Sequence, residues 1–198
     1  VTGYDGNAII VAGTKEGANS DVVQIEDNSS GNSVDISVRY PQHCRNCDAS
    51  VQFQVQIPRS ISYQLDRIHS ISGDVKVSSV TGRVDAATVS GNVTVTDVSG
   101  SVSAKSVSGD VDVDISKLDG SGDMTFATVS GSVTVKVPQG LDAQVEMSSF
   151  SGSIDTNLPI QVEKNQYTTS QKASARLGSG SRRLRMTTVS GNVSLKEL

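Results

Sequence analysis

The chain has 198 residues, of which 35% are hydrophobic and 4% aromatic, and it contains no Trp. Its 17 basic and 21 acidic residues give a formal net charge of −4, which argues against a general nucleic-acid binder, and no run approaches the roughly 18 apolar residues of a membrane-spanning helix. Because serine (32), valine (28) and glycine (18) dominate, the composition predicts one domain of strands around a thin core of small β-branched side chains.

Residues 1–70 are expected to form irregular strands that cap one end of the fold. Apolar and polar residues alternate in three of their segments, which is typical of half-buried strands. These segments are residues 34–40 (VDISVRY), 51–57 (VQFQVQI) and 61–65 (ISYQL). A longer stretch from Val55 resembles one from Val135, so Pro58 and Pro138 are predicted to mark equivalent corners.

Cys44 and Cys47 are the only cysteines and are spaced as C-x-x-C. A zinc site needs four ligands, and the remaining soft candidates are only His43 and His69. A redox pair would precede a helix, and no helix is predicted nearby. The pattern therefore favours a small disulfide loop between Cys44 and Cys47, with two reduced thiols as the next alternative and a metal or redox role less favoured.

An internal repeat begins near residue 71. Five glycines are spaced nine residues apart, in units such as ISGDVKV, VTGRVDA and VSGNVTV, and the pattern resumes three times after an insertion. Glycine supplies the backbone freedom that a sharp corner needs. The glycines predicted to form structural corners are Gly73, Gly82, Gly91, Gly100, Gly109, Gly131, Gly152 and Gly191.

The repeat units alternate between endings of Val-x-Val and Val-x-Ala, so that the full repeat has 18 residues. Two short strands and two corners would close one coil, and stacked coils would pair strand to strand. In this arrangement Val93 and Val111 point inward, whereas Thr94 and Asp112 point outward. The sequence predicts an all-β, flattened β-solenoid, similar to a β-helix or β-roll, with nine-residue half-coils and about 18 to 22 residues per coil.

The alternative is an antiparallel sandwich of β-hairpins. Two-residue hairpin turns favour Asn-Gly or Asp-Gly, whereas here Ser-Gly is followed by Asp, Asn or Ser. The regular repeat therefore favours the solenoid. We expect one domain over residues 1–198, with regular repeats at 71–156, a loop or insertion at 157–181 and a closing coil at 182–198. Because an open solenoid end exposes unpaired strand edges, a homodimer through that end is also considered.

The V-S-G-[DNS]-V-x-V units, the corner at Val137–Gly140 and the closing segment RLRMTTVSGNVSL at Arg183–Leu195 together resemble the bacterial DUF4097 family, whose members are described as adhesins. The resemblance covers residues 50–198 well and the start weakly. It implies an all-β, solenoid-like domain of bacterial cell-envelope or secreted proteins. It implies no catalytic residues, so none are transferred to this chain.

Asp110, Asp112 and Asp114 alternate along one predicted strand and would suit calcium, as in β-rolls. The positions that follow the corner glycines, however, hold mostly Asn and Ser. We therefore favour solvated outer-face carboxylates, and a ladder of Asp, Asn and Ser that bonds to the corner backbone. No metal or cofactor is expected.

No Ser-His-Asp constellation, phosphate-binding loop or dinucleotide-binding motif is present in the sequence, so we expect no enzyme. The favoured function is adhesion, scaffolding or envelope sensing outside the bacterial cytoplasm, in the periplasm, at the cell surface or as a secreted protein. The partner would be a surface polymer or a protein, and not a nucleic acid. The alternatives are a polysaccharide-active β-helix enzyme and a calcium-dependent β-roll.

The charges are distributed unevenly along the chain. Residues 157–198 carry seven basic and two acidic groups, or +5, whereas residues 1–156 carry ten basic and nineteen acidic groups, or −9. Arg182, Arg183 and Arg185 are therefore candidate contacts for an anionic polymer. The favoured alternative is that Arg183 and Arg185 occupy the outer face of a strand and pair with neighbouring rows of Asp.

Overall fold

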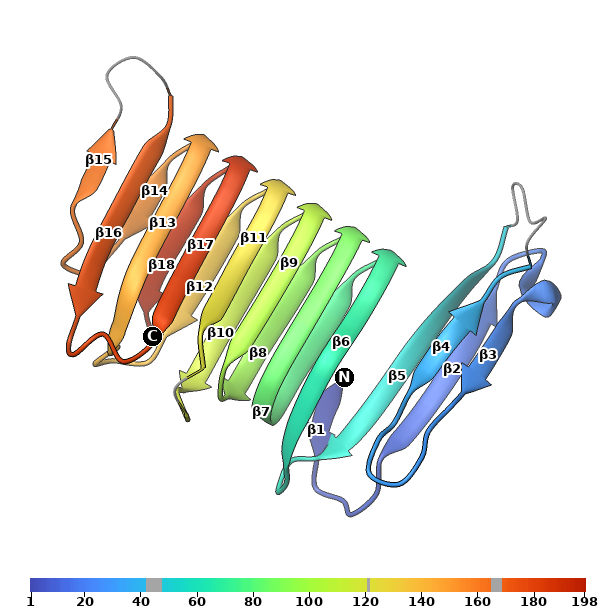
Figure 1. Ribbon diagram of the computed structural model, residues 1–198. Coiled ribbons are helices and arrows are strands. Elements are labelled where there is room, and N and C mark those ends of the chain that lie inside the picture. Colours follow the sequence, from blue (N-terminus) through green and yellow to red (C-terminus); the bar gives the residue numbers. More distant parts are fainter. Residues whose placement is uncertain (42–47, 121, 165–168) are drawn as a thin grey trace.

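The computed structural model describes residues 1–41, 48–120, 122–164 and 169–198, and it confirms the predicted all-β solenoid (Figure 1). Within these ranges the only helix is a short 3-10 turn, η1 at Ser20–Val22, and none is long and apolar enough to cross a membrane. The strands are β1 Thr2–Tyr4, β2 Ile10–Glu16, β3 Gln24–Asp27, β4 Ile36–Arg39, β5 Ser50–Pro58, β6 Ser62–Ser72, β7 Val75–Ser90, β8 Val93–Ser99, β9 Val102–Ser108, β10 Val111–Lys117, β11 Met124–Ser130, β12 Val133–Val137, β13 Ala143–Ser151, β14 Ile154–Thr156, β15 Val162–Lys164, β16 Gln171–Leu177, β17 Arg183–Ser190 and β18 Val193–Glu197.

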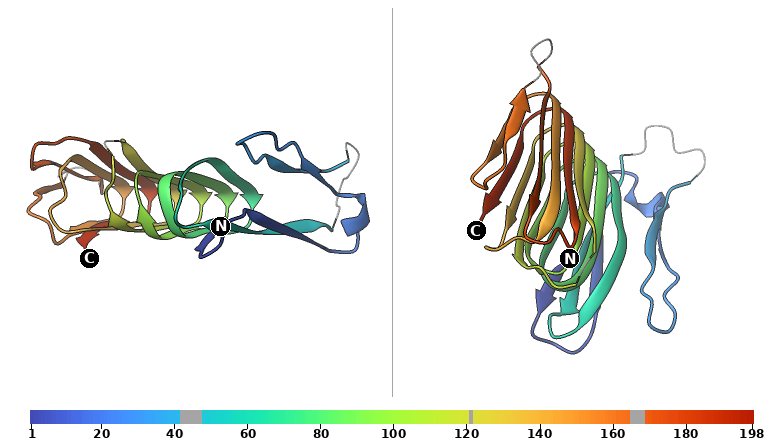
Figure 2. Two further views of the ribbon diagram at one scale, coloured as in Figure 1. Left: turned by 90° about the horizontal axis from the view of Figure 1, so that it is seen from below. Right: turned by 60° about the vertical axis from the view of Figure 1, so that its left-hand side comes forward.

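The coils form two facing layers, which we call sheet I and sheet II (Figure 2). Sheet I has the order β6, β7, β9, β11, β17, β13, β16, β15, and sheet II has the order β5, β1, β7, β8, β10, β12, β18, β14. The long strand β7 belongs to both, because its first half pairs with β8 and its second half with β9. Most coil-to-coil pairings are parallel, as a wound chain requires.

The predicted inward and outward assignment of the repeat is confirmed. Val75, Val93 and Val111 lie in register on adjacent strands of sheet II, and each is buried. The alternate positions Thr94 and Asp112 lie on the outer face. Each coil thus adds one row of small apolar side chains to a continuous core between the sheets.

One corner of each coil is built from a stack of glycines that leaves no room for a side chain. Gly109 has φ +146°, and a Cβ on it would lie 2.0 Å from the carbonyl oxygen of Gly91 in the neighbouring coil. Buried hydroxyls hold the same corner: Thr128 Oγ1 donates to Gly109 O at 2.8 Å, and Ser106 Oγ donates to Gly91 O at 2.9 Å. Stacked coils can therefore approach closely at this corner only with glycine.

The residues after these glycines form the predicted Asp, Asn and Ser ladder. Asp74 Oδ1 accepts the backbone N–H of Asn92 at 2.9 Å, and Asn92 Oδ1 accepts that of Asp110 at 2.8 Å. Asp110 Oδ1 in turn accepts the N–H of Ser132 at 2.7 Å. Each side chain satisfies a corner N–H of the next coil, so these residues hold the stack in register.

The N-terminal residues form an arm that extends away from the stacked coils (Figure 1). In this arm β2 pairs antiparallel with β5, and β3 pairs antiparallel with β4 as a separate two-stranded sheet. The last part of β5 pairs with β1 in parallel and so connects the arm to sheet II. The predicted N-terminal strands therefore exist, but β2, β3 and β4 do not continue the coil.

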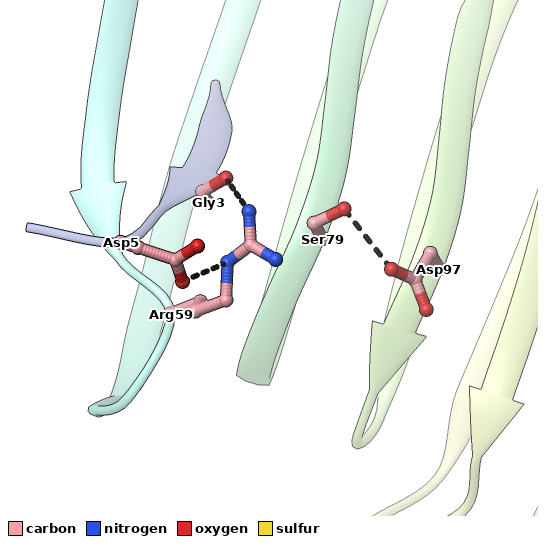
Figure 3. A network of polar contacts seen from close by, with 5 residues as sticks. All are labelled: Gly3, Asp5, Arg59, Ser79 and Asp97. Atoms are coloured by element: carbon pink, nitrogen blue, oxygen red, sulfur yellow. Dashed lines mark hydrogen bonds and ion pairs between the residues drawn. The ribbon is translucent and has the colours of Figure 1, made fainter.

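A small polar network lies where the arm meets the coils (Figure 3). Arg59 Nε lies 3.0 Å from Asp5 Oδ1, and Arg59 Nη2 donates to Gly3 O at 3.2 Å. Beside it, Ser79 Oγ donates to Asp97 Oδ2 at 3.0 Å, and both residues have positive φ. These contacts fix the turn after β5 against β1 and join β7 to β8 at two neighbouring residues with positive φ.

The order of the repeats in the sequence predicts that the closing coil lies at the end of the solenoid. The structure places it one coil position before the end. Strand β17 lies between β11 and β13, and β18 lies between β12 and β14. The chain thus leaves one coil position open after β12, forms β13 and β14 beyond it, and returns to fill the gap (Figure 1). The final strand is consequently paired on both sides and needs no cap.

The segment 157–181, expected as a loop or insertion, contains two strands. β16 pairs antiparallel with β13 over seven residue pairs, and β15 pairs antiparallel with β16. Where the glycine repeat stops, the chain changes from parallel coils to an antiparallel edge and does not lose its regular structure.

Cys44 and Cys47 lie outside the described residues, so the predicted disulfide remains a prediction.

Candidate functional site

Four basic side chains lie on the outer face of sheet I, where β17, β13 and β16 are adjacent. We call Lys172, Arg176, Arg183 and Arg185 the basic face. Strict alternation directs these side chains outward, because their neighbours Ala173, Leu184 and Met186 are buried. The residues come from two segments that the antiparallel and parallel pairings to β13 bring together.

The register sets the spacing of these charges. Gln144 of β13 lies between Arg183 of β17 and Arg176 of β16. Two residue pairs further along, Glu146 lies beside Arg185, and it is the only acidic residue of β13 on this face. Adjacent strands are about 4.8 Å apart and rise about 3.3 Å per residue, so the four cations spread over about two strand spacings across the sheet and about 13 Å along it.

Arg183 and Arg185 occupy the outer face of β17, as the favoured alternative predicts, but they do not pair with rows of Asp among the described residues. Neither side chain makes an ion pair or a hydrogen bond with any residue that the structure describes. The nearest carboxylate contact involves the backbone, since Asp123 Oδ1 accepts the N–H of Arg183 at 3.0 Å. Both guanidinium groups therefore remain exposed to solvent and to any external anion.

Arg182 lies just before β17, and its side chain is only partly exposed. Its Nε and Nη1 are buried, and neither has a hydrogen-bond acceptor within the described part of the chain. Buried donors without a partner are uncommon in folded proteins. Because Arg182 alternates with the outward Arg183, these donors lie on the inner side of the strand and not on the basic face.

The turn between β16 and β17 is held by Asp142, which precedes β13. Its carboxylate accepts the Ser179 hydroxyl at 2.8 Å and the Gly180 N–H at 2.7 Å. The Ser179 hydroxyl and the N–H groups of Gly180 and Ser181 lower the pKa of Asp142 to about 2. The same turn also contacts Arg176, whose Nε donates to the carbonyl oxygen of Ser179 at 2.8 Å. Asp142 thus positions both strands that carry the basic face.

The sequence identified Arg182, Arg183 and Arg185 as a group but did not place Lys172 and Arg176 beside them. The missing signal was the strand alternation in QKASARL, residues 171–177, which puts Lys172 and Arg176 on one face. The segment lacks the glycine repeat, so the repeat pattern alone predicts a loop there. Its antiparallel pairing to β13 depends on the tertiary fold.

The acidic row on sheet II consists of Asp110, Asp112 and Asp114, and two of these side chains contact neighbouring coils. Asp114 Oδ2 lies 3.2 Å from Lys136 Nζ, and Asp110 belongs to the corner ladder. Burial, with repulsion from Asp110 as the second cause, raises the pKa of Asp112 above its ordinary value. Among the described residues, no three His, Cys, Asp or Glu side chains form a group that could hold a metal ion.

The corner opposite the glycine stack contains a shallow cleft of about 280 Å³. Its charged lining residues are Arg83 and Asp119, and hydroxyls of Ser62, Thr81 and Ser99 complete much of the wall. Asp119 also pairs with Lys117 at 3.0 Å. The cleft therefore presents one carboxylate rather than the pair that glycoside hydrolysis requires.

Comparisons with known proteins place the repeats in a family. The model of the family described as Toastrack DUF4097 matches residues 54–196, which is most of the chain. A search of curated proteins finds no match. Among solved structures, a candidate cell adhesion protein from Clostridium sporogenes is similar, with 11% sequence identity, a TM-score of 0.48, and coverage of 100% of this chain and 86% of that chain.

Proposed function

The chain belongs to the Toastrack DUF4097 family, and from this premise we propose that it is a non-catalytic adhesion or scaffold module that works outside the bacterial cytoplasm and contacts anionic surface polymers. The observation that carries the proposal is the basic face. Its Arg183 and Arg185 side chains are exposed and have no acidic partner among the described residues.

The geometry of the basic face suits an extended polyanion better than a small ligand. The cations lie on a sheet surface rather than in a cavity, and they are spread across neighbouring strands. Arginine binds phosphate, sulfate and carboxylate groups through paired N–H donors, which the exposed side chains of Arg183 and Arg185 can supply. A flat array of this kind would bind weakly at each cation and gain affinity from repeated anionic groups.

The solenoid supports this role mechanically. Each coil is paired to the next by backbone hydrogen bonds and by the corner ladder, so the surface is carried on a rigid stack. A binding surface on strands keeps its charge spacing without having to order a loop. The protein therefore needs no moving part to present the basic face.

A binding titration with dextran sulfate, and with neutral dextran as the uncharged comparison, tests the proposal. We expect binding to dextran sulfate alone, and a steep loss of affinity as NaCl rises from about 0.05 to 0.5 M, because salt screens exposed charges. Arg185→Glu should weaken binding by roughly tenfold. The matched control is Lys76→Glu on the outer face of sheet II, which changes the net charge equally but lies away from the basic face.

Two results would contradict the proposal. One is an equal loss of affinity for dextran sulfate in Arg185→Glu and Lys76→Glu, which would mean that binding depends on the net charge and not on the position of the basic face. The other is the release of new reducing ends from an anionic polysaccharide during incubation, which would indicate turnover and favour an enzyme.

A further inference from the structure

A row of exposed apolar side chains runs along the glycine corner. Consecutive coils each contribute one residue at the end of a sheet I strand, and the strand ends lie side by side (Figure 1). In spatial order the row is Ile71, Val89, Val107, Val129, Val189 and Phe150, which we call the apolar ridge. Ile71 is 81% exposed, Phe150 is 65% exposed, and the four valines are about half exposed.

Alternation along each strand forces the ridge outward. In β7 the side chains of Val84, Ala86 and Thr88 point into the core, so Val89 must point out. Thr88 is fixed in that orientation because its hydroxyl donates to Gly73 O at 3.0 Å. The outward position of the valine is thus set by the corner and not by a local irregularity.

The opposite corner shows that exposure is not a general property of these repeats. There the equivalent residues before the turn, Val80, Val98 and Ile115, are buried. The same kind of residue is therefore packed inside at one corner and left in solvent at the other. A contiguous exposed apolar row on a soluble protein marks a surface that another molecule covers.

The size and charge of the ridge fit a second copy of the chain. The six ridge residues are between 48% and 81% exposed and form one contiguous row. A stable dimer takes about 800 Å² from each partner, so the contact would include the ridge and the neighbouring outward column. That neighbouring column lies two residues before the ridge and continues into Lys172 beside Ser148. In spatial order it consists of His69, Ala87, Lys105, Ala127, Thr187 and Ser148, so in a two-fold contact Lys105 lies opposite Ala127. Two such surfaces can meet without strong repulsion.

The ridge is also complementary to itself. Its rows repeat at the strand spacing of about 4.8 Å, so a copy related by a two-fold axis presents rows at the same interval. With the axis between Val107 and Val129, Ile71 of one copy meets Phe150 of the other, the largest side chain at one end against the largest at the other end. The acidic corner residue Asp110 then lies opposite the neutral Ser132 of the second copy.

We propose that two copies of the chain associate ridge to ridge, with their long axes antiparallel. The contact lies along the side of the solenoid and not at its end. The contact does not include Arg176, Arg183 or Arg185, whereas Lys172 borders it beside Ser148, so the dimer would present the arginines of both copies to one polymer. A lipid surface fits the ridge less well, because Asp74 and Asp110 border it and no Lys or Arg is present in the corner ladder.

Sedimentation velocity over a micromolar concentration series tests the association. We expect the wild-type protein to be a dimer, and Val107→Asp and Val129→Asp each to weaken dimerisation by roughly tenfold or more, because each places charge at the centre of the contact. The matched control is Ile61→Asp, since Ile61 is 50% exposed but lies outside the ridge, and it should leave the dimer intact. Thermal melts confirm that all three variants are folded.

A monomeric wild-type protein throughout the series overturns the proposal, and so does an unchanged dimer in both Val107→Asp and Val129→Asp. Binding of a monomer to neutral lipid vesicles would identify a membrane as the occupant instead. Disulfide trapping in a Cys44→Ser, Cys47→Ser background tests the orientation. Ile71→Cys protein should crosslink to Phe150→Cys protein, whereas an Ile71→Cys homodimer would contradict the antiparallel arrangement. None of these substitutions alters the basic face, so the polymer titration is an independent result.

Discussion

The stacked coils and the N-terminal arm use the same alternation of apolar and polar residues, yet only the coils bury it fully. In the coils, Val93, Val95 and Val111 are almost completely shielded from solvent. In the arm, Val34 is about half exposed although residues 34–40 alternate equally well, and the strand residue Ile10 is also about half exposed. The difference shows that alternation defines a strand face but that only a second sheet opposite it makes a core.

The reason lies in how many neighbours each strand has. A strand such as β10 is paired on both sides and faces sheet I across the core. The strands β3 and β4 pair only with each other, and a two-stranded sheet is marginally stable on its own. We therefore expect the arm to open locally at a much lower free energy than the coils.

The largest expected effect comes from placing a charge in the solenoid core. Val111→Asp should lower the free energy of unfolding by about 3 to 5 kcal/mol, because it buries an unpaired carboxylate between two sheets. Ile10→Asp, the corresponding change in the arm, should alter it by less than about 0.5 kcal/mol. Urea unfolding followed by circular dichroism measures both.

Thr94→Asp serves as the control within the coil, since Thr94 lies on the outer face one residue from the core position Val93. Its effect should resemble that of Ile10→Asp. Equal destabilisation by Val111→Asp and Thr94→Asp would contradict the inward and outward assignment.

A smaller effect should separate two glycines with positive φ. Gly109→Ala meets the carbonyl of Gly91 in the next coil and should cost about 2 to 3 kcal/mol in unfolding free energy. Gly31 in the arm has φ +56°, and a Cβ there would meet nothing within 4 Å, so Gly31→Ala should cost only about 1 kcal/mol. The comparison fails if the two substitutions have equal effects on the urea midpoint.

The smallest expected effect is on the decrease of thermal stability at acidic pH. The pKa of Asp142 is lowered from 3.8 to about 2 by the Ser179 hydroxyl and by backbone N–H groups, so its carboxylate stabilises the folded state fully above pH 3.8. That contribution is lost as the pH falls through about 2. Asp142→Asn should therefore make the decline in thermal midpoint between pH 4 and pH 2 shallower.

Asp27 in the arm provides the comparison for this titration. The Ser29 hydroxyl and N–H lower the pKa of Asp27, but within a two-stranded sheet rather than between coils. Asp27→Asn should change the acid dependence of the arm and leave the main transition unaltered. An identical response of the main transition to both variants would mean that the arm and the coils unfold as one unit.

Much of the fold could be predicted because its cause is local and repeated. The Val-x-Val pattern specifies which side of each strand is buried, and glycine at positions such as Gly91 and Gly109 permits a corner that other residues cannot adopt. The candidate site was predictable only in part. Arg183 and Arg185 follow a recognisable repeat, whereas Lys172 and Arg176 joined them through an antiparallel pairing that no repeat signals.

The sequence of coils in space was not predictable from the repeat. The units around Gly131, Gly152 and Gly191 have nearly the same local pattern, so any of them could follow any other. The core offers a physical reason for the observed order. Large side chains such as Phe126, Met186 and Met147 lie in register on β11, β17 and β13, and they fill the same layer next to one another.

By itself, the sequence determined that this protein winds into a valine-lined solenoid with glycine corners, because side-chain alternation and backbone sterics act over only a few residues. The tertiary structure alone decided that the last coil fills a gap left earlier, that one corner leaves its apolar row in solvent, and that two distant basic segments share a face. These outcomes depend on which strands pair across long chain separations. Equivalent repeats compete for the same partners, and only packing of the whole core selects among them.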